Sequence, residues 1–300
     1  MNRNIKNISK QKERDVLKAE RLRDLLNETK KVAFICCSYD TSFESIENQV
    51  IEKVHQLVKT FGLNEKIVWS LWVVDDLPEE AGFGRAVQKG FSAVSKKLGD
   101  ESRLKLIKMR NAISMTGALK GRALLDGMSV ALKNDPDLAA LVYMNLNLKV
   151  DARFSTEGLM QVLCEGFDAS IGTRHPREGG TAVGRGLAGN IKSWAFNALV
   201  RLLLKPINCY YDTNAPMKVY NPAAAKLLIR RGVIQTVGMD CDWLMLLHLN
   251  NYEVFRFPIV WSQRLGSRVP WHMVLPCFMD VLKIRKRWKM GKMNFIKSVG

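Results

Sequence analysis

Polar clusters stand directly after apolar runs of strand length, and their residue types suit a charged ligand. One run ends in Asn145-Leu146-Asn147, another in Asp75-Asp76, and a third in Gly172-Thr173-Arg174. In an open α/β sheet, ligands bind beyond the carboxyl ends of the strands, so we expect these clusters to meet at one edge. Carboxylates and amides there can accept hydrogen bonds from sugar or base groups or hold a cation, and arginine suits phosphate.

Basic residues near glycines form a second group. Lys120 precedes a glycine, and Arg174, Arg177 and Arg185 surround a glycine-rich segment at residues 178–186. The arginine fork matches phosphate geometry. The segment lacks the Gly-Lys-Ser/Thr spacing of a P-loop. We therefore expect a basic loop that is mobile when it is empty.

Further charged residues lie in the second half of the chain, namely Asp212-Thr213, Lys218, Asp240 and Asp242. Asp240 and Asp242 fall at the expected start of a helix. Acids in a first helical turn can serve the helix dipole alone, so a structural role for this pair stays open.

Strands alternate with helices in the first half of the chain, and the strands are continuous apolar runs. Both features predict a mostly parallel sheet that is covered on two faces. Strands are expected at residues 31–37, 66–74, 103–108, 138–144 and 168–174. Helices are expected at residues 42–61, 84–98, 120–133, 184–204, 222–231 and 238–250. A last strand is expected at residues 252–261, with Pro258 marking an edge or an end.

The two ends of the chain differ from its centre. Residues 1–30 mix both charge signs and predict an exposed helix or a mobile arm. Residues 31–268 form the expected main domain, and residues 269–300 predict a basic amphipathic helical segment. From Lys283 onwards this segment has seven Lys or Arg residues and no acid, which suits an anionic bilayer; an ordinary packed surface helix is the alternative. Its expected apolar side consists of Trp271, Leu275, Phe278, Leu282 and Trp288.

The overall composition favours a polyanionic partner. The 300 residues have a net charge of +17 and are 47% hydrophobic, so the chain can bury a sizeable core. No recognition helix or aromatic platform stands out, so no specific nucleic acid is expected. The cysteines lack metal-site spacing and are expected to be reduced. Neither a signal peptide nor a membrane-spanning run is expected.

The order of these motifs resembles the inverting GT-A glycosyltransferases of family two, and most of all the dolichyl- or polyprenyl-phosphate hexosyltransferases. The resemblance covers about residues 31–269. Asp75-Asp76 is similar to the family's nucleotide-binding acids, and Lys120-Gly121 to its Gly-Lys-Gly segment, with Leu119 in place of the first glycine. Ser38 and Asp40, in the loop after the first strand, join the implied nucleotide-sugar contacts, as do Asn145 and Asn147.

The later motifs extend this resemblance to the acceptor side. Gly172-Thr173-Arg174 is similar to the family's Gly-Ser-Arg, and Asp212-Thr213 with Lys218 to its Asp-Thr-Gln-Cys-Gly-Phe-Lys. Asp240-Cys241-Asp242 is similar to its Asp-Val-Glu helix start, and Gly266-Ser267-Arg268 to its closing acceptor loop. The resemblance implies catalytic roles for Asp240, Asp242 and Arg174. It implies acceptor or phosphate contacts for Arg177, Arg185, Asp212, Thr213, Lys218 and Arg268.

Departures from the family pattern bear on the metal. The family holds Mg²⁺ or Mn²⁺ with Asp-Ala-Asp, where this chain has Asn145-Leu146-Asn147. Two neutral amides bind a hard dication weakly, so Asn147 would be a weak ligand at best. Pro216 also replaces a glycine of the Asp-Thr loop, and Leu77-Pro78-Glu79 replaces the usual Gly-Ser.

The resemblance implies transfer of a hexose from a nucleoside diphosphate sugar to a lipid phosphate or another glycan acceptor, with weak or no metal dependence. The positive charges that would then stabilise the leaving diphosphate are those of Lys120, Arg174, Arg177 and Arg185. We expect a peripheral protein on the cytoplasmic face of a membrane. The alternative is a catalytically degenerate GT-A protein that binds a nucleotide, a lipid head group or a partner protein.

Overall fold

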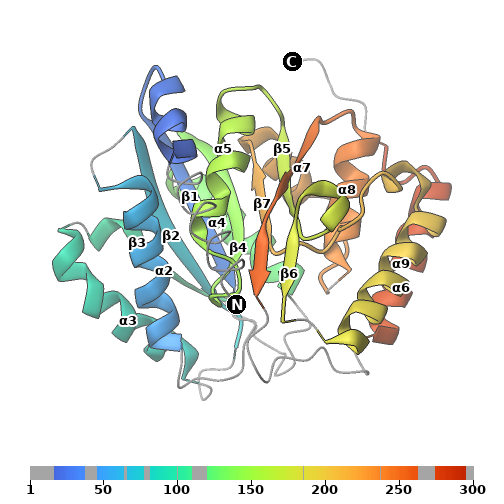
Figure 1. The fold of residues 1–300 in the computed structure, drawn as a ribbon, viewed down its shortest axis with the longest axis horizontal. Coiled ribbons are helices and arrows are strands. Elements are labelled where there is room, and N and C mark those ends of the chain that lie inside the picture. Colours follow the sequence, from blue (N-terminus) through green and yellow to red (C-terminus); the bar gives the residue numbers. More distant parts are fainter. Residues whose placement is uncertain are drawn as a thin grey trace, which may run out of the picture.

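A seven-stranded sheet forms the centre of the molecule, with helices on both of its faces (Figure 1). The computed structural model describes residues 17–37, 46–63, 66–77, 82–99, 101–109, 120–184, 186–236, 238–262 and 274–294. The strands are β1 (Lys30–Cys37), β2 (Ile67–Asp75), β3 (Leu104–Lys108), β4 (Leu138–Asn145), β5 (Ala169–Thr173), β6 (Thr181–Val183), β7 (Met217–Tyr220), β8 (Val254–Pro258) and β9 (Val260–Ser262). The main sheet has the order β3-β2-β1-β4-β7-β5-β8, and β6 pairs with β9 in a small second sheet.

The helices divide between the two faces of this sheet. They are α2 (Ile46–Phe61), α3 (Phe83–Leu98), α4 (Lys120–Asn134), α5 (Ser155–Leu163), α6 (Leu187–Leu203), α7 (Pro222–Arg231), α8 (Met239–Leu249) and α9 (Val274–Lys289). One hydrophobic core contains side chains of α2, α3 and α5, and the other contains side chains of α4, α6, α7, α8 and α9. The predicted α/β architecture with a mostly parallel sheet is thus confirmed.

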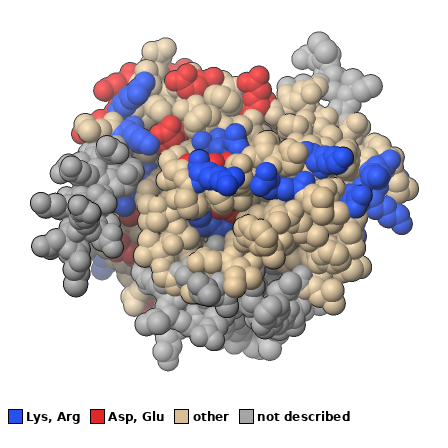
Figure 2. Space-filling view, turned by 45° about the vertical axis from the view of Figure 1, so that its right-hand side comes forward, with Lys and Arg blue, Asp and Glu red and all other residues tan. Residues whose placement is uncertain are grey.

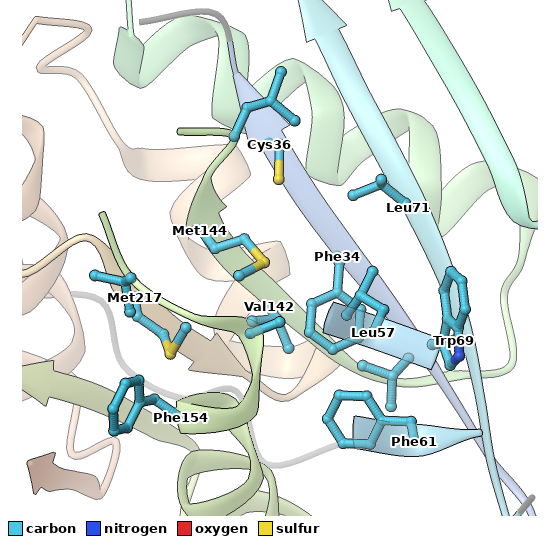
Figure 3. Close-up of a cluster of buried hydrophobic side chains, with 14 of the residues drawn as sticks. Phe34, Cys36, Leu57, Phe61, Trp69, Leu71, Val142, Met144, Phe154 and Met217 are labelled. Atoms are coloured by element: carbon cyan, nitrogen blue, oxygen red, sulfur yellow. The ribbon is translucent and has the colours of Figure 1, made fainter. Parts of the chain in front are cut away.

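Successive side chains of a strand point to opposite faces of the sheet, and here both sets are apolar, so helices must pack on both faces. In β1, Phe34 and Cys36 belong to the α2–α3 core, whereas Ile35 and Cys37 belong to the α4–α8 core. Figure 3 shows the first of these cores, where Phe34 meets Phe61 of α2 with ring centroids 5.6 Å apart. All six cysteines are free thiols.

Strand β7 is the antiparallel member of the main sheet, between β4 and β5. It was not predicted, because its four residues are too few to show a period and one of them is Lys218. Its direction matters for the site. The start of β7 lies at the edge where β4 and β5 end, and Lys218 is in register with Tyr143.

Two further predictions need correction. The strand expected at residues 252–261 is interrupted at Ile259 into β8, an edge strand that ends at Pro258, and β9, which joins the second sheet. The segment 178–186 was predicted without a strand, but it contains β6, which pairs with β9 from Thr181 to Val183.

The described residues near the two ends of the chain also pack more closely than predicted. Residues 17–25 form a helix, one of the two predicted alternatives, but this part of the chain is not wholly exposed, because Leu22 and Leu26 are buried in the α2–α3 core. The predicted C-terminal helix is present as α9, but its buried side consists of Cys277, Val281 and Ile284, while Leu275 of the expected apolar side is exposed. Trp271 lies outside the described residues.

Candidate active site at the carboxyl edge of the sheet

Tyr143 on β4 is the centre of a buried cluster of charges near the carboxyl edge of the sheet. The ammonium of Lys120, the first residue of α4, lies 4.9 Å from the centre of the Tyr143 ring. The ammonium of Lys218, on the neighbouring β7, lies 5.2 Å from the same ring. Two cations on one aromatic ring gain from its electron-rich face, but they repel each other.

Lys218 is almost fully buried and is paired with the second residue of α8. Its Nζ lies 2.8 Å from Oδ1 of Asp240 and donates a hydrogen bond of 2.6 Å to the carbonyl of Ala215. Burial lowers the pKa of the Lys218 ammonium, and the charge of Lys120 adds to this shift, while the carboxylate of Asp240 opposes it.

Arg174, directly after β5, forms the second ion pair of the site. Its Nε and one terminal nitrogen each lie 2.7 Å from an oxygen of Asp212, and its backbone N–H donates to the same carboxylate at 2.9 Å. Burial would raise the pKa of Asp212, but the charge and hydrogen bonds of Arg174 outweigh it and lower that pKa. Arg174 also donates to the carbonyl of Asn214, so its guanidinium is largely committed to the protein.

Asp242 takes part in a separate structural contact. One carboxylate oxygen accepts from the backbone N–H groups of Val233 and Ile234, at 2.9 and 3.2 Å. The other lies 2.7 Å from a guanidinium nitrogen of Arg287 on α9. Burial raises the pKa of Asp242 despite these partners. The side chain therefore joins α8 to α9, and its contacts do not favour the catalytic role expected from the sequence.

The two acids after β2 have different positions. Asp75 is buried and accepts from the backbone N–H of Leu77 at 3.1 Å, and its carboxylate faces Gly84 in the first turn of α3. Burial raises the pKa of Asp75. Its contacts are those of a turn and of a helix start. Asp76 is also buried. Its charge is close enough to Cys37, at the end of β1, to contribute to the raised pKa of that thiol.

Gly121 is required by a close approach of two backbones. Its N–H donates to the carbonyl of Gln235 at 2.7 Å, and a Cβ at this position would lie 2.9 Å from that carbonyl. The loop before α8 is thereby fixed against the start of α4, which carries Lys120.

Asn145, the last residue of β4, and Asn147 do not form a metal centre that suits Mg²⁺ or Mn²⁺. The amide oxygen of Asn147 accepts from the backbone N–H of Lys149 at 3.4 Å, and that of Asn145 accepts from the Tyr143 hydroxyl at 3.4 Å. In the described part of the chain, no group of three or more His, Cys, Asp or Glu side chains has an arrangement that could hold a metal ion. Neutral amides engaged in local contacts are a poor donor set for a hard dication.

The remaining expected residues lie around this cluster or outside the described residues. Thr213 is buried, and its hydroxyl lies 3.5 Å from the Cys241 thiol. Arg177 is at the surface, where it donates to the Tyr211 hydroxyl at 3.4 Å. The residues that lie outside the described part are Ser38, Asp40, Arg185 and Arg268.

Sequence reasoning missed two aromatic residues of this region. Tyr143 reads as an ordinary core residue of an apolar strand, and only its position two residues before Asn145 gives a signal. Tyr211 precedes Asp212 and stacks on His175 with ring centroids 4.8 Å apart, while Arg201 of α6 lies 4.5 Å from its ring centre. The nearby arginines lower the pKa of the exposed Tyr211 hydroxyl.

A groove of about 660 Å³ lies on the other face of the sheet, beside the turn that follows Asn147. Residues of α2, of the segment after β4 and of β9 line it. The polar members include Asn48, Glu52, His55, Gln56, Lys149 and Arg153. This groove is separate from the charges around Tyr143.

Comparisons with solved structures establish the fold. The glucosyl-3-phosphoglycerate synthase of Mycobacterium tuberculosis, solved with Mn²⁺, UDP and phosphoglyceric acid, is 14% identical, with a TM-score of 0.58 over 89% of this chain and 82% of that one. The same enzyme with Mn²⁺, UDP-glucose and glycerol 3-phosphate is 13% identical, with a TM-score of 0.55 over 89% and 83%. A mycobacterial protein described only as such is 13% identical, with a TM-score of 0.60 over 89% and 78%.

No family model and no curated protein matches the chain. At these identities the likeness concerns the fold alone, a GT-A-like α/β fold that the chain shares with the mycobacterial synthase.

Proposed function

We propose that this chain is an inverting glycosyltransferase that moves a hexose from a nucleoside diphosphate sugar to a phosphorylated acceptor, such as a lipid phosphate or a phosphorylated glycan. The observation that carries the proposal is the pair of buried cations, Lys120 and Lys218, on the ring of Tyr143. Buried cations that are held in place before the reaction stabilise a leaving diphosphate without having to reorganise.

The ion pairs give these residues distinct roles in the proposed reaction. Asp240 fixes Lys218, and Asp212 fixes Arg174, so each carboxylate would act by orienting a cation. Lys120 begins α4, where the helix N-terminus also favours a phosphate group. A phosphate acceptor is already anionic at neutral pH, so the reaction needs positioning more than a strong general base.

Other expected residues keep their proposed roles. Asp76 would contact the nucleotide, with Asp75 supporting the turn beside it. Arg177, at the surface, would meet the acceptor phosphate. Ser38 and Asp40 on the donor side, and Arg185 and Arg268 on the acceptor side, are proposed from the sequence alone. The proposed reaction does not depend on a metal ion, because the Asn145 and Asn147 amides do not fit one.

A second candidate is supported by the same contacts. Asp240 and Asp242, the acids that the sequence assigns to catalysis, are both held in ion pairs, with Lys218 and Arg287. A protein that has the GT-A fold but only binds a nucleotide or an anionic head group needs no free catalytic acid, so these ion pairs would not impair it. Binding without turnover would identify it.

Calorimetric titration with nucleoside diphosphates and their sugars, in EDTA and then with Mn²⁺, tests the proposal. UDP and UDP-glucose come first, because the similar mycobacterial synthase has been solved with both. We expect binding that survives EDTA and is followed by sugar transfer to a phosphorylated acceptor. Binding only with Mn²⁺ would contradict the metal-independent mechanism. Binding of a nucleotide with no transfer to lipid-phosphate or soluble phosphate acceptors would support the second candidate, and no binding at all would contradict both.

A further inference from the structure

One face of α6 is apolar and exposed along most of the helix. Ile191 is 59% exposed, Trp194 72% and Leu202 72%. Ala195 and Ala198 are exposed between them. The spacing of these residues places them on one side of the helix. A tryptophan with most of its surface in water is unusual for a side chain that gains much from burial.

Helix α9 lies beside α6 (Figure 1) and has exposed apolar residues of its own. Leu275 is 66% exposed and Met279 is 46% exposed, both in the first half of α9. In the second half the exposed residues are basic, with Lys283, Lys286 and Lys289 facing solvent. Figure 2, which brings this side forward, shows a band of Lys and Arg side chains next to a broad uncharged area.

We propose that this α6–α9 face, defined by the exposed apolar residues of both helices, docks on an anionic bilayer. Tryptophan and leucine on an apolar face, bordered by lysine and arginine, are typical of surfaces that enter the interface between head groups and acyl chains. The basic border would add attraction to the anionic lipids. No helix among the described residues is long and apolar enough to cross a bilayer, so attachment through this face would be peripheral.

This proposal differs from the sequence expectation, which assigned membrane contact to residues 269–300 alone. Helix α6 contributes the largest exposed apolar side chain, Trp194, and lies outside that segment. The proposal deepens the proposed function, because docking would bring a lipid phosphate to the protein, but vesicle binding itself does not require glycosyl transfer.

Charge complementarity favours a bilayer over a second copy of the chain. Docking two such faces would place two sets of like charges, Lys283, Lys286 and Lys289 of each copy, in one interface. The whole chain has a net charge of +17, which adds to this repulsion. An anionic lipid surface instead neutralises these charges.

Sedimentation of the full chain with vesicles tests the proposal. The vesicles contain phosphatidylcholine with or without phosphatidylglycerol. We expect binding that requires phosphatidylglycerol and weakens with salt, and we expect Trp194→Ser to lower the affinity by ~10-fold or more. Leu17→Ser is the matched control, since Leu17 is 62% exposed on the helix at residues 17–25 and should not change binding. Both replace exposed side chains, so neither should alter folding.

Brominated lipid gives a second measurement, because it should quench tryptophan fluorescence in the native chain more than in Trp194→Phe. Equal vesicle binding by Trp194→Ser and the native chain, or equal quenching, would overturn the proposal. A dimer of the native chain that Trp194→Ser disrupts would instead assign the face to a second copy. Nucleotide titration of Trp194→Ser separates the two proposals: intact nucleotide binding with lost vesicle binding concerns docking alone.

Discussion

Replacing Arg287 by alanine is the sharpest test of how the C-terminal helix supports the rest of the domain. In the native chain a guanidinium nitrogen of Arg287 lies 2.7 Å from Asp242, whose side chain is 0% exposed. Removing one partner of a buried ion pair costs ~3–5 kcal/mol, because the other charge stays buried without compensation. Asp242 keeps the backbone donors of Val233 and Ile234, so we expect a loss at the lower end, ~3 kcal/mol in the free energy of unfolding.

Urea denaturation followed by linear extrapolation measures this loss. Lys286→Ala is the control, because Lys286 is exposed on the same helix and its replacement should change stability by less than ~0.5 kcal/mol. Adding Asp242→Asn to Arg287→Ala should restore part of the stability, since the neutral amide can still accept from the two backbone donors. A loss for Arg287→Ala no larger than the control would refute the reasoning.

The same variant has a defined pH dependence. Burial already raises the pKa of Asp242 in the native chain, and loss of Arg287 should raise it further. The unfolded state has a carboxyl pKa of ~3.9. Between that pH and the raised pKa of Asp242, the folded state therefore binds a proton that the unfolded state does not. The stability deficit of Arg287→Ala should therefore shrink as the pH falls through the raised pKa of Asp242. A constant deficit would contradict an uncompensated charge.

Three further changes test the candidate site. Asp212→Asn should lower the free energy of unfolding by ~3 kcal/mol at neutral pH by leaving Arg174 unpaired. Because Arg174 lowers the pKa of Asp212, the native chain should lose its greater stability over the variant as the pH falls through that lowered pKa. Urea denaturation across this pH range would show the free energies of unfolding of the two chains becoming equal. Lys120→Ala should weaken nucleoside diphosphate binding by ~10–100-fold in calorimetry, with Lys120→Arg retaining most of it; an unchanged affinity would remove Lys120 from the site. Asn145→Asp combined with Asn147→Asp should create Mn²⁺ binding that calorimetry detects and the native chain lacks; equal titrations would refute our account of the amides.

Local patterns predicted most of the fold and the positions of several site residues. Asp76, Asn145 and Arg174 follow strands of a mostly parallel sheet, so their common edge follows from the rule for such sheets. The strand that carries Lys218 could not be found this way, because four residues show no period and its antiparallel direction depends on where the preceding chain returns. The contact between Lys218 and Tyr143 therefore could not be predicted from the sequence.

Contacts between distant parts of the chain left no signal in the sequence. Asp242 and Arg287 are 45 residues apart, and each alone reads as a surface charge on an amphipathic helix. The exposed position of Trp194 was equally hidden, since an apolar stripe on α6 predicts a buried face. Whether such a stripe faces the core depends on which neighbour covers it, and no single sequence pattern records that.

The link between α8 and α9 has a consequence for the order in which the chain is synthesised. Domains form as the ribosome releases them from the N-terminal end, so α8 emerges before the residues that complete its surroundings. Until α9 follows, Asp242 has no guanidinium beside it, and Gly238 lacks the contact that Asp280 makes in the finished fold. The nascent domain must therefore remain incomplete until α9 has emerged from the ribosome. A fragment that stops before Val274 would be an unfinished domain, and the apolar surface that it exposes would favour aggregation.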